Sequence, residues 1–172
     1  MADRNESLEK SLHGVRVAIE TEIRGYEFFR AAADRCADPD GKEMFLSLAR
    51  EEVEHRKLLE REVKSLIDQG KFLPHEEVMT QSPEEHTAIP VEAFRESLKR
   101  SHFEMSAISI GVVLEQNAIA HFKAMAEETD DEEARKTFSW LAEWERGHLD
   151  QLRGLDQMMR DEYWSEQGFT PM

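Results

Sequence analysis

An internal repeat with an offset of 93 residues constrains the fold of this chain more than any other feature. The motif Glu-x-x-His occurs twice, and a glutamate lies 30 residues before each copy. The repeated polar residues are Glu22, Glu52 and His55 in the first half and Glu115, Glu145 and His148 in the second. Apolar residues keep the same register, pairing Phe29 with Phe122, Phe45 with Phe138, and Leu59 with Leu152. Such self-similarity predicts a duplicated structural unit.

The spacing inside each copy predicts α-helices. Steps of three and four residues lead through Phe45, Leu48, Glu52, His55 and Leu59, and the second copy follows the same steps. Residues spaced in this way lie on one stripe of a helix. The glutamates and histidines are therefore expected on the face that each helix buries, with apolar neighbours above and below them.

Four long helices are expected, at about residues 8–36, 42–69, 91–128 and 132–163. Two turns are expected, at Asp38-Pro39-Asp40-Gly41 and at Thr129-Asp130-Asp131. The second turn also provides an expected N-cap for the helix that follows, and Gly70 is expected to end the second helix. Two short turns make two antiparallel hairpins, and the connector 70–90 is long enough to cross the length of a bundle. The sequence predicts one all-α domain over residues 1–163, a four-helix bundle with one long crossover between its second and third helices, followed by an irregular tail, 164–172.

The two hairpins predict a site for two metal ions. In each hairpin the repeated polar residues are equidistant from the turn, so that they lie at one depth. Four buried carboxylates would be costly without compensating charge, and two divalent cations would neutralise them. Oxygen and nitrogen donors without thiolate suit iron, with manganese or zinc as alternatives. The register excludes Glu20, Glu51 and Glu54 as ligands, because they align with Val113, Trp144 and Gly147.

Composition excludes several classes of function. The formal charge of −15 argues against a nucleic-acid partner, which would require a basic surface. No apolar run approaches the ~18 residues of a membrane span, and the polar start is unlike a signal peptide. Cys36 is the only cysteine, which fits a reducing cytoplasm and excludes a four-cysteine metal centre within this chain.

The segments Ala18–Phe29 and Leu48–His55, with their repeats around Glu115 and Glu145, resemble rubrerythrin-type members of the ferritin-like superfamily. The resemblance covers about residues 8–160. It implies a non-haem centre of two iron ions, oxidation of ferrous iron by oxygen or peroxide, and homodimers or larger assemblies. Ala118 stands where rubrerythrins carry an extra glutamate, and no rubredoxin-like segment is present. Electrons are therefore expected from an external donor, such as a rubredoxin-like protein, or from ferrous iron itself.

Three functions are compatible with this pattern. The first is a di-iron oxidoreductase that oxidises Fe(II) or reduces peroxide, and the second is an iron-binding or storage protein that feeds an oligomeric shell or partner. The third is a di-iron hydroxylase, which would need a substrate pocket beside the metals. A purely structural bundle is the remaining alternative. Trp140 and Trp144, which flank the stripe of the fourth helix, are expected to be packing or subunit-interface residues.

Overall fold

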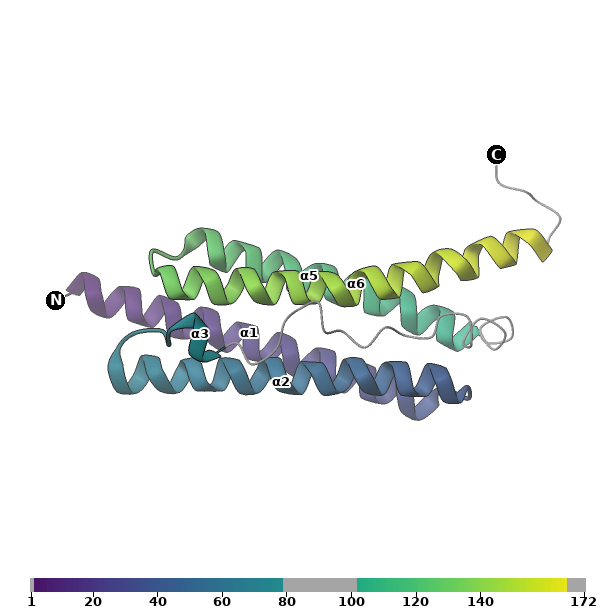
Figure 1. The fold of residues 1–172 in the computed structure, drawn as a ribbon, viewed down its shortest axis with the longest axis horizontal. Helices are drawn as coiled ribbons and strands as arrows, with labels where there is room; N and C mark the ends of the chain where they lie inside the picture. The colour runs from purple at the N-terminus through teal and green to yellow at the C-terminus, as the bar shows by residue number, and fades with distance from the viewer. Residues whose placement is uncertain (1, 79–101, 167–172) are drawn as a thin grey trace.

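The computed structural model describes residues 2–78 and 102–166, which form an all-α bundle (Figure 1). Its long helices are α1 (Ala2–Arg35), α2 (Pro39–Gln69), α5 (His102–Glu128) and α6 (Glu132–Glu166), and a short helix, α3 (His75–Val78), follows α2. Helices α1 and α2 pack as one antiparallel hairpin, α5 and α6 pack as another, and α1 also contacts α5. The predicted bundle of two hairpins is confirmed. Much of the predicted crossover and the predicted start of the third helix fall in 79–101, outside the described residues.

Several predicted helix ends were wrong by a few residues. Helix α1 begins at Ala2 instead of near residue 8, and α2 begins at Pro39 instead of residue 42. Proline is compatible with the first helical position because the amide hydrogen it lacks has no partner there. Helix α6 continues to Glu166, three residues beyond the predicted end. The connector also contains α3, which contacts α6.

Side-chain and glycine caps explain where the helices begin and end. Asp38 accepts a hydrogen bond from the amide of Gly41 (2.8 Å) and caps α2. Asp131 accepts hydrogen bonds from the amides of Glu133 (2.9 Å) and Ala134 (3.1 Å), which confirms the predicted cap of α6. Gly70 ends α2 with a left-handed φ of 68°, a conformation that glycine adopts without steric cost.

The core consists of two apolar clusters separated along the bundle axis. One contains Phe29 and Phe45, whose rings stack with centroids 6.5 Å apart and planes at 21°. The other contains Phe122 and Phe138, whose rings are also 6.5 Å apart, with planes at 18°. These pairs are related by the 93-residue register, and each lies toward the turn of its own hairpin. The hairpins therefore point in opposite directions, and the register places the repeated polar residues between the two clusters.

Candidate metal centre

The six repeated polar side chains meet in the layer between the apolar clusters. Helix α1 contributes Glu22 and α5 contributes Glu115, while α2 and α6 each contribute a Glu-x-x-His pair, Glu52 with His55 and Glu145 with His148. None of the six residues is more than 4% exposed. All of them lie on the buried stripes that the sequence spacing predicts, so the six residues singled out from the sequence converge at one place.

Their oxygen and nitrogen atoms form two overlapping groups. The first group is Glu22, Glu52, His55 and Glu145, and the second is Glu52, Glu115, Glu145 and His148. Within each group, one such atom per residue lies within 4.8 Å of the others. Glu52 and Glu145 belong to both groups. Because a carboxylate has two oxygens, each of these residues can face two neighbouring cation positions at once.

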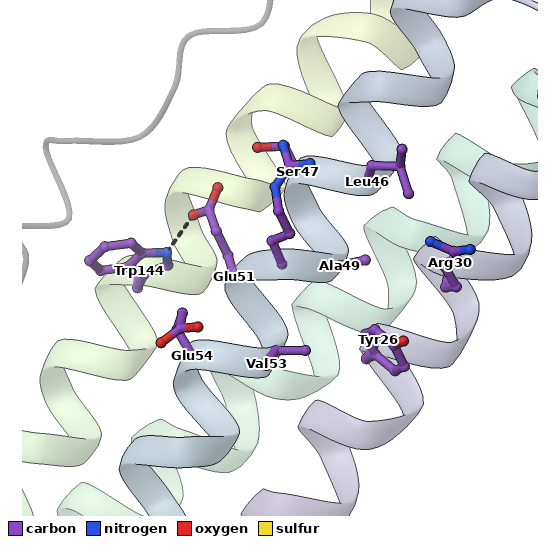
Figure 2. A pocket seen from close by; sticks show the side chains of 10 residues that line it. Tyr26, Arg30, Leu46, Ser47, Ala49, Glu51, Val53, Glu54 and Trp144 are labelled. Atoms are coloured by element: carbon purple, nitrogen blue, oxygen red, sulfur yellow. Dashed lines mark hydrogen bonds between the residues drawn. The ribbon is translucent and has the colours of Figure 1, made fainter.

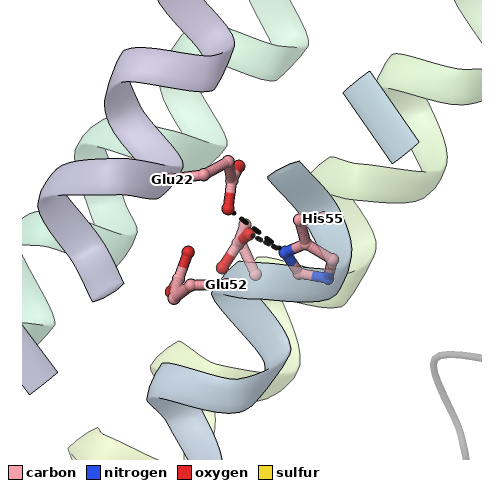
Figure 3. Close-up of side chains that lie close together, drawn as sticks. Glu22, Glu52 and His55 are labelled. Carbon is pink, nitrogen blue, oxygen red and sulfur yellow. Dashed lines mark ion pairs between the residues drawn. The ribbon is translucent and has the colours of Figure 1, made fainter. Parts of the chain in front are cut away.

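Several atoms of the cluster are buried without a hydrogen-bond partner among the described residues. They are both carboxylate oxygens of Glu22, both ring nitrogens of His55, and Oε1 of Glu115 and of Glu145. His55 Nδ1 lies 3.4 Å from Glu22 Oε2 (Figure 3) and 2.9 Å from Glu145 Oε1, but neither contact makes a hydrogen bond. Buried polar atoms normally have partners. Donor atoms that converge without partners, with four carboxylates to balance two dications, fit a bound metal pair.

The carboxyl groups of the cluster differ strongly in proton affinity. Burial raises the pKa of Glu22, Glu52 and Glu115 well above 4.5, and the charge on Glu145 raises each further. Burial also acts to raise the pKa of Glu145, but the facing imidazoles outweigh it and hold that pKa well below 4.5. In the absence of cations, the raised pKa values favour protons on these three carboxyl groups, and bound metal ions would displace those protons.

The orientation of His148 is set by a residue outside the six. Its Nδ1 faces the cluster, 2.9 Å from Glu145 Oε2, while its Nε2 lies 3.0 Å from Glu51 Oε2. Trp144 Nε1 donates a hydrogen bond to the same oxygen of Glu51 at 2.9 Å. The sequence interpretation left Glu51 out of the predicted ligand set and did not predict this contact. The available signal was the register, which aligns Glu51 with Trp144 directly beside the repeated glutamates.

A small cavity reaches the cluster from the side, between α1 and α5. It has a volume of about 130 Å³ and is lined by Glu52 and Glu115 together with polar residues such as Thr21, Arg24 and Asn117. Gly25 also lines it, and a Cβ built at this glycine would lie 2.8 Å from Cδ of Glu52. The missing side chain therefore leaves the space that the Glu52 carboxylate occupies.

A larger surface pocket lies over α2, with a volume of about 770 Å³. Figure 2 shows that Glu51 and Trp144 lie at one side of this pocket, joined by their hydrogen bond. Tyr26 and Arg30 lie at the other side. The Glu51 side chain is 21% exposed, so the carboxylate that contacts His148 is reachable from solvent.

Two antiparallel helical hairpins that enclose a buried cluster of four glutamates and two histidines define a ferritin-like bundle with a carboxylate–histidine centre. The family model of rubrerythrin matches residues 15–156, a range that contains all six cluster residues. The chain belongs to the rubrerythrin family, which implies iron binding and fits a di-iron site. Curated proteins and solved structures gave no match to this chain. No helix within the described residues is both long and apolar enough to cross a membrane.

Proposed function

We propose that this protein is a non-haem di-iron oxidoreductase that oxidises ferrous iron with oxygen or hydrogen peroxide. The observation that supports it is the pair of overlapping donor groups that share Glu52 and Glu145. In the proposal, Glu22 and His55 complete one iron position, and Glu115 and His148 complete the other. Two bound ferrous ions would supply the two electrons that, with two protons from solvent, reduce one hydrogen peroxide molecule to two water molecules.

The residues of this chain would hold the metals and control access to them. The two apolar clusters close the layer along the bundle axis and keep bulk water from the donor atoms. The cavity between α1 and α5 leaves one lateral approach, which ends at Glu52 and Glu115. The side-chain amide of Asn117 can donate a hydrogen bond to a small polar oxidant as it enters, and the Thr21 hydroxyl, which donates to the carbonyl of Val17, can accept one from hydrogen peroxide.

The size of this cavity favours a small oxidant over a bulky organic substrate. Its volume of about 130 Å³ admits a few water-sized molecules. Pockets that bind larger organic ligands typically measure about 300–1,000 Å³. None of the six cluster residues lines the larger pocket of about 770 Å³ over α2, so the small cavity is the one that disfavours the hydroxylase alternative. Assembly size would separate the oxidoreductase from a storage protein, since a shell-forming oligomer would favour storage and a dimer would favour the enzyme.

Anaerobic loading with Fe(II), followed by metal analysis, tests the proposal. The wild-type protein should bind two irons per chain and develop the absorption of an oxo-bridged ferric pair after addition of peroxide or oxygen. Glu52→Ala and His55→Ala should each lose iron, whereas the control Glu54→Ala should keep it, because Glu54 lies on the exposed face of α2 and pairs with Lys57. Unchanged iron content in Glu52→Ala and His55→Ala would show that the site is assigned wrongly. Comparing the reoxidation rates with peroxide and oxygen identifies the oxidant.

A further inference from the structure

We propose that the two metal positions are unequal, and that Glu51 makes the position beside His148 bind metal more tightly than the position beside His55. The inference rests on the proposed function, because it concerns the same pair of metals. Glu51 is a positioning residue in this proposal, since it would act through the imidazole of His148 and not on a metal.

The asymmetry arises at a single position of the 93-residue register. Glu51 and Trp144 are equivalent in the repeat, and each directly precedes a glutamate shared by the two donor groups. His148 meets the carboxylate of Glu51, with Nε2 and Oε2 3.0 Å apart. His55, its equivalent, meets the indole of Trp144 edge-on, with ring centroids 5.4 Å apart and planes at 88°. This position of the repeat therefore places a carboxylate beside one histidine and an indole beside the other.

These two neighbours have different chemistry. A carboxylate accepts the Nε2–H of an imidazole, which fixes the tautomer with Nδ1 toward the metal and makes that nitrogen a stronger donor. An indole has one N–H donor and no acceptor. The indole N–H of Trp144 instead donates to Glu51, which holds the carboxylate against His148. The same tryptophan thus supports one histidine through Glu51 and packs perpendicular to the other without supplying it an oxygen or nitrogen acceptor.

His55 has no comparable support among the described residues. Its Nε2 is buried without a hydrogen-bond partner there, and its ring also packs edge-on against Trp140, with centroids 6.1 Å apart. Packing fixes the plane of the His55 ring but supplies no acceptor for an N–H. The His148 position should therefore bind a divalent cation more tightly, and a bound iron there should have the lower reduction potential.

Titration of the full chain with Co²⁺, followed by visible absorption, tests the proposal without relying on turnover. The wild-type protein should bind two ions in steps whose affinities differ at least about tenfold. The tight step should survive His55→Ala and disappear in His148→Ala. Glu51→Gln should weaken the tight step by about 10- to 100-fold and leave the weak step unchanged. The control Glu54→Gln makes the same chemical change on the exposed face of α2 and should alter neither step.

Proton NMR of the Co²⁺-loaded protein provides a readout that a merely structural role would not change. The Nε2–H of His148 should give a hyperfine-shifted signal that exchanges slowly with solvent, and Glu51→Gln should accelerate that exchange. Trp144→Phe keeps an aromatic ring but removes the N–H that donates to Glu51. It should weaken the tight Co²⁺-binding step, by less than Glu51→Gln does. This variant tests the proposal if Glu51→Gln fails to fold. Two equal steps in the wild type, or an unaffected tight step in Glu51→Gln, would overturn this inference alone. A wild-type protein that binds no Co²⁺ would overturn the proposed function as well.

Discussion

Replacing Glu22 by glutamine should stabilise the protein without metal while weakening its binding of metal. Glu22 is 1% exposed, and neither of its oxygens has a hydrogen-bond partner among the described residues. Burial, reinforced by the charge on Glu145, raises its pKa well above 4.5. The raised pKa favours the protonated form of this carboxyl group in the folded, metal-free protein, whereas a glutamine needs no proton.

The magnitude follows from the distance between the working pH and the pKa of the unfolded chain. Each pH unit above 4.5 costs about 1.4 kcal/mol for a group that must take up a proton, which gives at most about 3.5 kcal/mol near pH 7. Because the folded pKa is raised, the contribution of Glu22 to stability is full below pH 4.5 and is lost as pH rises through the folded pKa. The advantage of Glu22→Gln should accordingly vanish near pH 4.5 and grow toward neutral pH.

Urea denaturation of chelator-treated protein, followed by circular dichroism at several pH values, measures this effect. The upper bound of about 3.5 kcal/mol near pH 7 corresponds to a rise in Tm of at most roughly 7–14 °C for a chain of this size. Glu20→Gln is the matched control, because Glu20 is exposed on the same helix and pairs only loosely with Arg24 at 3.5 Å. That change should stay within about 0.5 kcal/mol.

Added metal should stabilise Glu22→Gln less than it stabilises the wild-type protein. Zn²⁺ should raise the unfolding free energy of the wild type more than that of Glu22→Gln, because the variant offers a neutral amide in place of a charged ligand. The reasoning is refuted if metal-free Glu22→Gln is less stable than the wild type near pH 7, or if it binds Zn²⁺ as tightly.

Two further predictions concern a glycine beside the site and a buried carboxyl group away from it. Gly25→Ala should weaken metal binding by about tenfold in a Zn²⁺ titration, because the new Cβ would lie 3.0 and 3.1 Å from the oxygens of Glu52 and displace them. Gly154→Ala, which meets no atom within 4 Å, should leave binding unchanged and stabilise α6 by about 1 kcal/mol. Glu62 accepts a hydrogen bond from the amide of Leu73, and burial raises its pKa to about 7. Its contribution to stability is therefore full below pH 4.5 and lost as pH rises through 7, so Glu62→Gln should raise the unfolding free energy at pH 8 by about 2 kcal/mol, after a discount for solvent screening, and have little effect at pH 4.5.

The sequence alone determined which residues could meet. Steps of three and four residues placed Glu52 and His55 on a buried stripe, and the 93-residue register selected them over Glu51 and Glu54. Cap residues such as Asp131 were also visible, because capping depends on contacts within a few residues. These features are local, so periodicity and turn chemistry predict them directly. Helix starts were less accurate, as the starts of α1 at Ala2 and of α2 at Pro39 show.

Tertiary structure decided how the two hairpins face each other. Only the packed bundle shows that Glu52 and Glu145 belong to both donor groups, and that the lateral cavity opens beside Gly25. The contact of Glu51 with His148 also depends on the rotation and stagger of α2 against α6. Residues 97 positions apart meet through that packing, and the spacing within each helix does not encode it. The repeat predicts a symmetric site, and the packing shows that its two histidines have different neighbours.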